Sequence, residues 1–248
     1  MGAPDKEVSF AVPTGNFGNV YAGYAARCMG LPIKRLIIGS NRNDILTRFF
    51  DSGAMEVHEV TPSLSPSMDI QVSSNFERLL LDFYDRNGAR VASAMKKFRK
   101  SGQLKLETKL FRTVCDLFVA CRLDDEGTLE TIAREYKKTG VLLDPHSAVG
   151  VHAARQLGDG KAANGTPVVA LATAHPAKFP EAVEKATGTR PQVPVALAGL
   201  KGLPERFEVL PTDIDAIAGY MRDHAAIMNG DAKGSAGEES RKHGEASP

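Results

Sequence analysis

The stretch Val8–Gly30, VSFAVPTGNFGNVYAGYAARCMG, reads as a strand, a sharp turn and a helix. The apolar run VSFAV is typical of a strand buried on both faces, and Val20, Tyr24 and Cys28 follow helical spacing. The turn between them, PTGNFGN, is rich in glycine and asparagine. Another apolar run, RLIIG, follows the helix, and this alternation predicts parallel β-α-β units.

The same alternation of apolar runs and helical spacing organises most of the 248 residues. It predicts an α/β fold: a doubly wound, mostly parallel sheet with helices on both faces and a helical insertion. We expect one domain over 1–225, with sheet-forming units at 8–60 and 141–190, a helical segment at 61–140, a C-terminal segment at 191–225, and a disordered tail at 226–248. The tail has almost no apolar residue to offset its ordering entropy.

Four local patterns refine this prediction. AMEVHEV, residues 54–60, is predicted to form a third strand, and VLL, residues 141–143, a strand before the turn DPHSAVG. Thr108–Arg122 is predicted to be helical throughout. Ser74 and Glu77 have the spacing of a capping box at the start of a helix.

The turn PTGNFGN is a candidate anion site. A strand that ends in this turn and opens a helix directs backbone N–H groups and the positive end of the helix dipole at one spot. Gly15 and Gly18 are expected to allow close approach and positive φ, while Asn16 and Asn19 add amide donors. A phosphate monoester suits such a turn, although a glycine-rich turn without a ligand remains an alternative. The Walker and dinucleotide-binding patterns are both absent, which disfavours a triphosphate or a dinucleotide.

Two further polar turns follow apolar runs, LATAHPAKF and DPHSAVG. Together they bring six chemically useful residues: Thr173, His175, Lys178, Asp144, His146 and Ser147. In a doubly wound sheet such turns share the carboxyl edge of the strands, so we expect one crevice built from all three turns. As alternatives, the histidines would be satisfied by backbone groups, Ser147 and Thr173 would only cap helices, and Asp144 would only start a turn.

The charge balance and the cysteines limit the partners and the setting. Lys and Arg number 31 against 30 Asp and Glu, so no overall field attracts nucleic acid or an anionic membrane. No apolar run approaches the roughly 18 residues of a membrane span. Three cysteines, an odd number without CxxC spacing, favour a reducing, cytoplasmic setting.

Four motifs in this order carry a family resemblance: PTGNFGN, SPSMDIQVSSNFER, DPHSAVG and TAHPAKF. They closely resemble the C-terminal part of bacterial and fungal threonine synthases, pyridoxal-phosphate enzymes of the tryptophan-synthase-β group, also called fold type II. The resemblance implies an incomplete large domain of that fold. It also implies a lyase that eliminates phosphate from O-phospho-L-homoserine and adds water at the neighbouring carbon, which yields L-threonine.

The resemblance also assigns residues to the cofactor. It implies that the cofactor phosphate lies in a loop formed by Gly15, Asn16, Phe17, Gly18 and Asn19. Thr173 matches the hydroxyl that faces the pyridine nitrogen, and Asp144 resembles the acidic residue near the same ring. Ser73–Asn75, in SSNFER, would either bind an anion or only cap a helix.

The sequence departs from the family at the covalent anchor. The family's Schiff-base lysine lies upstream of the phosphate loop in a Ser-Phe-Lys-Asp-like motif, and here only Lys6 precedes the loop. Lys178 matches a lysine of the family's own AHPAKF, and an ordinary protonated lysine is a poor nucleophile. We therefore expect an N-terminally truncated enzyme that has no catalytic residue and is inactive alone, with an exposed sheet edge that invites self-association. The alternatives are a complementing module that binds phosphate or pyridoxal phosphate, and another fold type II lyase resembling a serine or threonine deaminase.

Overall fold

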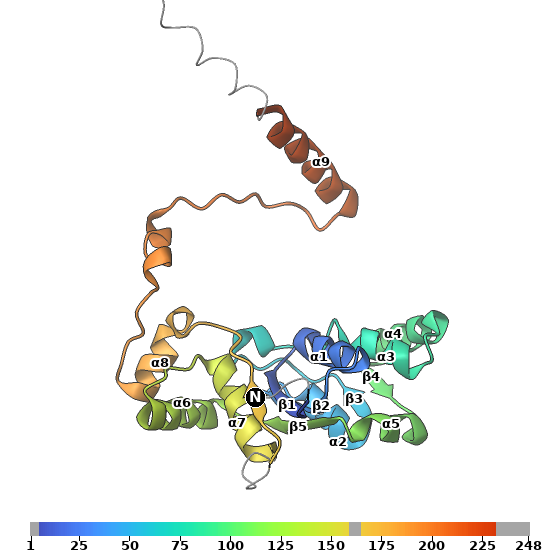
Figure 1. Cartoon of the computed structure of the whole chain (residues 1–248). Coiled ribbons are helices and arrows are strands. Elements are labelled where there is room, and N and C mark those ends of the chain that lie inside the picture. The colour runs from blue at the N-terminus through green and yellow to red at the C-terminus, as the bar shows by residue number, and fades with distance from the viewer. Residues whose placement is uncertain (1–4, 159–164, 232–248) are drawn as a thin grey trace, which may run out of the picture. The chain divides into compact units, whose positions relative to one another are not determined.

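The computed structural model describes residues 5–158 and 165–231 (Figure 1). The chain divides into two compact units, Met1–Val195 and Ala196–Pro248. The sequence predicts a single domain up to residue 225, so the first unit ends earlier than expected. The division falls in a stretch rich in proline and glycine, and its apolar side chains, such as Val195 and Leu203, are exposed and do not extend the core.

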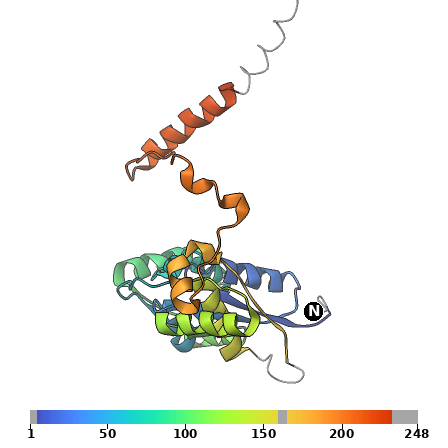
Figure 2. The ribbon, with the colours of Figure 1, turned by 90° about the vertical axis from the view of Figure 1, so that its left-hand side faces the viewer.

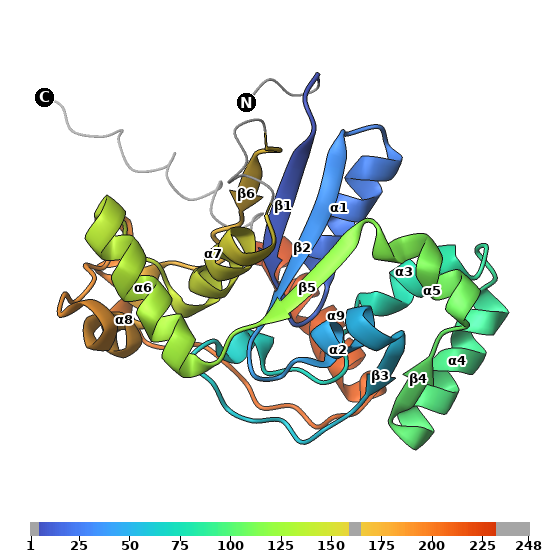
Figure 3. The ribbon, with the colours of Figure 1, turned by 90° about the horizontal axis from the view of Figure 1, so that it is seen from below.

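Four parallel strands form the central sheet. They are β1 (Val8–Pro13), β2 (Ile33–Ser40), β5 (Phe118–Arg122) and β6 (Val168–Ala170), in the order β5-β2-β1-β6 (Figure 3). Ala11 of β1 lies opposite Ile37 of β2 and Ala170 of β6. The predicted α/β fold with a mostly parallel sheet is thus confirmed.

Helices cover both faces of this sheet. The helices of the first unit are α1 (Gly18–Cys28), α2 (Ile45–Ser52), α3 (Phe76–Phe83), α4 (Gly88–Ser101), α5 (Thr108–Cys115), α6 (Asp125–Thr139), α7 (Pro145–Leu157) and α8 (Pro180–Thr187). Leu36 and Ile38 pack into the large core that includes residues of α1 and α2, while Ile37 packs with Ala153 of α7. Since successive strand residues point to opposite faces, α7 covers the face opposite α1 and α2.

Aromatic rings fill the larger core. The cluster draws on the turn after β1 and on α2, α3 and β5, and its rings make contacts with centroid distances such as 4.8 Å for Phe49 and Phe76; its members are Phe17, Phe49, Phe50, Phe76 and Phe118. Phe17 contributes the turn after β1 to this cluster, at 5.4 Å from Phe76. The turn is therefore anchored in the core through one side chain.

The predicted helical insertion contains strands, which corrects the prediction for 61–140. Residues 118–122 form β5, the edge strand beside β2, where the sequence predicts the end of a helix. The apolar run FVACR fits either period, and pairing with β2 in the core decides for the strand. The segment 54–60 forms only β3 (Ala54–Glu56), which pairs antiparallel with β4 (Gln103–Lys105) outside the main sheet.

The predicted strand at 141–143 is absent, since these described residues are assigned to no strand. Val141 is 54% exposed, and the segment leads directly into the start of α7. Helices α6 and α8 pack against each other beside it, at the end of the sheet away from α3, α4 and the antiparallel pair β3 and β4 (Figures 1 and 2).

The chain reverses its direction across the sheet between β1 and β6. From β1 it passes through α1 to β2 and then on to β5, with the connecting helices α1 and α2 on one face. It then returns through α7 on the other face and places β6 beside β1. In open α/β sheets, ligands bind outside the carboxyl ends of strands at such a switch point.

The remaining elements are short turns and the second unit's helix. Short 3-10 helices cover Pro66–Met68, Pro176–Lys178, Val195–Leu197 and Leu200–Gly202. Helix α9 (Ile214–Asp231) continues through the first residues of the predicted tail at 226–248, which corrects the start of that tail. Residues 232–248 lie outside the described residues. None of the described helices is long and apolar enough to cross a membrane.

Candidate functional site

The turn between β1 and α1 is held by its own residues and by the core. The Thr14 side-chain oxygen Oγ1 accepts a hydrogen bond from the Phe17 N–H at 3.0 Å. Phe17 has φ 66° and ψ 6°, and its ring is fully buried. The sequence predicts a positive φ at Gly15 and Gly18, and that prediction is wrong, because in this turn the positive φ falls on Phe17. The aromatic contacts of the buried ring compensate for the strain of this backbone geometry.

The turn presents backbone donors to one side. Among the described residues, the N–H groups of Gly15, Asn16, Gly18 and Asn19 donate to no protein acceptor. Helix α1 begins at Gly18, and no side chain caps its start. An anion placed there meets the N–H groups and the positive end of the helix dipole, so the turn has the chemistry of a phosphate site.

Gly15 is needed for close packing. A Cβ atom at Gly15 would lie 2.9 Å from the Met68 Cα and 3.1 Å from the Ile70 Cδ1. No side chain other than hydrogen therefore fits between the turn and the segment around Met68 without displacement.

Ser73–Asn75 holds the turn after β1 from outside. The Ser73 hydroxyl donates to the Gly15 carbonyl oxygen, and the Asn16 carbonyl oxygen accepts from the Asn75 N–H at 3.1 Å and from the Asn75 Nδ2 at 3.0 Å. The Ser74 hydroxyl donates to Asn16 Oδ1 at 3.2 Å, and among the described residues no hydrogen bond joins Ser74 to Glu77, so the predicted capping box does not form. These residues therefore act as a clamp on residues 15 and 16.

The three predicted turns meet at one cavity of about 290 Å³, near the lower end of the size typical of small-molecule sites. Its lining combines the turn after β1 with Ser67, Met68, His146, Thr173, Ala174 and Lys178. The cavity lies at the carboxyl ends of β1 and β6, which is the switch point of the sheet. The predicted convergence of the turns is thus observed in the geometry.

His175 and Lys178, two of the residues predicted to build the crevice, are both exposed. His175 is exposed, and its Nδ1 accepts the Ala177 N–H at 3.1 Å, which makes it a local cap. Lys178 lines the cavity but is exposed, with its Nζ 5.9 Å from the ring centroid of Phe179. Lys178 thus lacks the desolvation that would activate an amine.

Asp144 lies beneath the cavity wall and does not line it. The residue is 1% exposed and caps α7, where its Oδ1 accepts the His146 N–H at 2.9 Å. The Ser147 hydroxyl donates to its Oδ2, and His146 Nδ1 lies 3.0 Å from its Oδ1. Burial alone would raise the pKa of Asp144, but the hydrogen bonds from His146 and Ser147 outweigh it and hold the pKa below its ordinary value.

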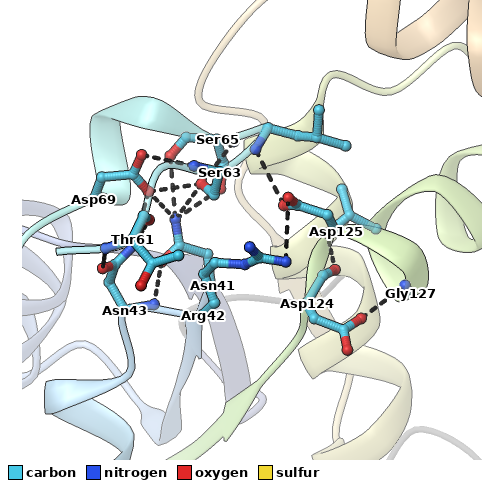
Figure 4. A network of polar contacts seen from close by, with 12 residues as sticks. Asn41, Arg42, Asn43, Thr61, Ser63, Ser65, Asp69, Asp124, Asp125 and Gly127 are labelled. Carbon is cyan, nitrogen blue, oxygen red and sulfur yellow. Dashed lines mark hydrogen bonds and ion pairs between the residues drawn. The ribbon is translucent and has the colours of Figure 1, made fainter. Parts of the chain in front are cut away.

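A buried polar network fixes the segment that carries Met68, and sequence reasoning missed it (Figure 4). Asn41, directly after β2, donates through Nδ2 to Ser63 Oγ at 2.7 Å and to Asp69 Oδ1 at 2.7 Å. Asn43 donates to the same Asp69 oxygen at 2.9 Å and to the Thr61 carbonyl oxygen at 2.8 Å. These contacts tie residues 61–69 to the carboxyl end of β2.

The network extends to the segment after β5, where α6 begins. Asp125, at the start of α6, accepts the Leu64 N–H at 3.1 Å and pairs with Arg42 at 3.4 Å (Figure 4). Met68 in turn packs with Leu123 and Val149. The wall of the cavity opposite Gly15 is thus supported from β2, β5 and α7. The signal in the sequence was the polar cluster directly after an apolar strand, SNRND.

Comparisons with known proteins agree with this architecture. A family model described as "Threonine synthase, C-terminal" matches residues 147–221. The threonine synthase of Pseudomonas aeruginosa is 49% identical over 90% of this chain and 47% of its own length. The threonine synthase of Saccharomyces cerevisiae is 36% identical over 94% of this chain and 46% of its own length.

Solved structures give the same result. A threonine synthase from Brucella melitensis, solved with pyridoxal phosphate bound, superposes with a TM-score of 0.79 at 48% identity over 90% of this chain and 47% of that one. The yeast threonine synthase superposes with a TM-score of 0.76 at 34% identity over 91% of this chain and 48% of that one. The chain spans about half the length of these relatives. The chain is therefore similar to the C-terminal part of threonine synthases, and it carries the matching C-terminal family domain over residues 147–221.

Proposed function

We propose that this chain supplies the phosphate-binding side of a threonine synthase active site, which takes O-phospho-L-homoserine and water to L-threonine and phosphate. The observation that carries the proposal is the set of unpaired N–H groups of Gly15, Asn16, Gly18 and Asn19 at the switch point of the sheet. The Brucella relative, at 48% identity, was solved with pyridoxal phosphate bound.

The residues present fit a phosphate monoester such as that of pyridoxal phosphate. Four N–H donors and an uncapped helix start stabilise negative charge, and Gly15 keeps the turn open to a close approach. Phe17 supports this turn through its buried ring, while its N–H is already used by Thr14. We therefore assign Phe17 a supporting place in the loop and the other four residues the donors.

Thr173 is the residue we assign to the ring of the cofactor. It lines the same cavity as the phosphate turn and is exposed, and its own N–H donates to Ser147 Oγ at 3.2 Å. A neutral hydroxyl at the pyridine nitrogen stabilises a ring proton less than a carboxylate does, which suits elimination better than transamination. When bound, pyridoxal phosphate supplies the electron sink for loss of the substrate phosphate.

We further propose that the chain binds the cofactor without completing the reaction. Lys178 is exposed at the cavity, so its amine lacks the burial that makes a lysine nucleophilic. Turnover would then require groups from the half of the relatives that this chain does not span. Two finer points belong to the same proposal: self-association through the edge of β6, and a cytoplasmic location, which fits the free thiols of Cys28 and Cys121.

Binding is tested by titrating the chain with pyridoxal phosphate and following absorbance and phosphorus NMR. Asn19→Asp places a carboxylate among the N–H donors, so we expect at least tenfold weaker binding, which corresponds to about 1.4 kcal/mol. The matched control is Asn87→Asp, which makes the same change at the exposed start of α4, away from the cavity. Equal affinity in the two variants would contradict the assigned site.

The reaction is tested by adding the matching N-terminal half of the Pseudomonas threonine synthase as a separate polypeptide. We expect phosphate release from O-phospho-L-homoserine only in the mixture. Faster turnover of serine or threonine would favour a deaminase, and binding without turnover in a folded complex would leave only the binding module.

A further inference from the structure

The carboxylate of Asp144 connects two walls of the cavity without reaching the cavity itself. It is 1% exposed, whereas the residues that it contacts, His146 and Ser147, are hydrogen-bonded to Ser67 and Thr173 on two separate segments of the wall. Its place in the structure thus differs from the position beside the cofactor ring that the family resemblance implies.

The first connection passes through His146. The Ser67 N–H donates to His146 Nε2 at 3.3 Å, so this nitrogen carries a lone pair. The neutral ring then has its proton on Nδ1, where it faces Asp144 Oδ1 at 3.0 Å. The ring also packs against Phe179, with centroids 4.8 Å apart. The carboxylate therefore fixes the tautomer that allows His146 to hold Ser67.

The second connection passes through Ser147. Its hydroxyl donates to Asp144 Oδ2, which leaves the oxygen lone pairs free to accept the Thr173 N–H at 3.2 Å. Asp144 thereby directs the hydroxyl away from Thr173 and makes Ser147 an acceptor. Without the carboxylate, the hydroxyl would rotate among several partners.

We propose that Asp144 is a positioning residue that sets the distance of Ser67 and Thr173 from the phosphate turn, and that it does not contact the cofactor. The effect on ligand binding rests on the proposed function, whereas the effect on the two walls does not. A carboxylate that accepts hydrogen bonds from both His146 and Ser147 is suited to this task, because its loss releases the connections to Ser67 and Thr173 at once.

A plain capping function is the competing explanation, and the chain offers a matched comparison. Asp124 caps α6 in the same way, since its Oδ1 accepts the Gly127 N–H at 3.0 Å, but it is exposed and does not line the cavity (Figure 4). Asp144→Ala and Asp124→Ala therefore each remove an N-terminal helix cap, and only the first change removes the connection to Ser67 and Thr173.

The test is NMR of the labelled chain without ligand. In the unaltered chain we expect His146 protonated on Nδ1. Asp144→Ala should shift the amide resonances of Ser67 and Thr173 and raise their hydrogen exchange at least tenfold, while Asp124→Ala leaves both unchanged. Ser147→Ala, which keeps the cap, should move the Thr173 amide and spare Ser67. This second variant decides the matter if Asp144→Ala fails to fold.

Identical spectra at Ser67 and Thr173 in the two alanine variants would overturn the proposal, as would an unmoved Thr173 amide in Ser147→Ala. Titration with pyridoxal phosphate adds a second readout, in which Asp144→Ala should bind at least tenfold more weakly than Asp124→Ala. If the unaltered chain binds no pyridoxal phosphate, the proposed function fails, and the amide pattern still judges the positioning.

Discussion

Phe17 should tolerate glycine better than alanine, the reverse of what holds at an ordinary helical position. Its ring is fully buried among Phe50, Phe76 and Phe118, so either substitution loses about 3–5 kcal/mol of packing. The two variants differ in the backbone, because Phe17 has φ 66°. Alanine keeps a Cβ and pays about 1–2 kcal/mol for the left-handed conformation, which glycine avoids.

Glycine also gains entropy in the unfolded chain, which costs about 0.4–1 kcal/mol. The balance leaves Phe17→Gly more stable than Phe17→Ala by about 0.5–1 kcal/mol. Phe49 is the matched control, since it is equally buried but lies inside α2. There alanine should be the more stable by about 0.5–1 kcal/mol.

Urea unfolding of the four variants measures both differences. With a slope of about 2 kcal/mol per molar urea, the opposite signs should separate the two pairs of midpoints by about 0.5–1 M in total. If Phe17→Ala is as stable as Phe17→Gly, the turn is not strained at this residue, and the account of how it orients its N–H groups is wrong.

Three further predictions concern the site and its surroundings. Gly15→Ala should destabilise the chain by about 1–3 kcal/mol and weaken phosphate binding, because its Cβ would meet Met68. The control is Gly88→Ala, whose Cβ would point into open space and should change neither urea unfolding nor phosphate titration. Equal effects of the two substitutions would contradict this prediction. Asp144 has a lowered pKa, so the folded chain gives up its proton more readily than the unfolded chain; its stabilisation is present above the ordinary value of 3.8 and is lost as the pH falls below it. Acid unfolding should thus lose steepness in Asp144→Ala, and an unchanged profile would disprove the linkage. Iodoacetamide at pH 8 should label exposed Cys28 at least tenfold faster than Cys121, whose burial raises its thiol pKa to about 11. Peptide mass spectrometry measures both labelling rates, and equal rates would contradict this prediction.

The parts of the fold that could be predicted from the sequence are those with a local pattern. The β1-α1-β2 unit has an apolar strand, a glycine-rich turn and helical spacing within a few tens of residues. The carboxyl-edge placement of the turns follows from parallel topology, and with it the cavity. Strand β5 escaped prediction because its assignment depends on pairing with β2, which is far away in the sequence.

The supporting contacts of the site are non-local for the same reason. Asn41 and Asp69 are each unremarkable in the sequence, and only the folded chain brings the amide to the carboxylate. Likewise, nothing in SSNFER tells that Ser73 and Asn75 hold Gly15 and Asn16 instead of capping α3. Residue types therefore predict which turns can bind a ligand, but not which side chains hold those turns in place.

The two helices that begin at the switch point, α1 and α7, differ in what faces the positive end of their dipoles. The start of α7 is capped by a carboxylate of the same chain, because the buried Asp144 accepts hydrogen bonds from the first N–H groups of the helix. Helix α1 begins without a side-chain cap, and its first N–H groups face the cavity. A second carboxylate at the surface of the cavity would repel a phosphate bound at α1, whereas Asp144 beneath the wall is neutralised by its donors. Under the proposed function, the start of α1 is thus the place for an external anion, while the internal carboxylate of Asp144 positions the walls around it.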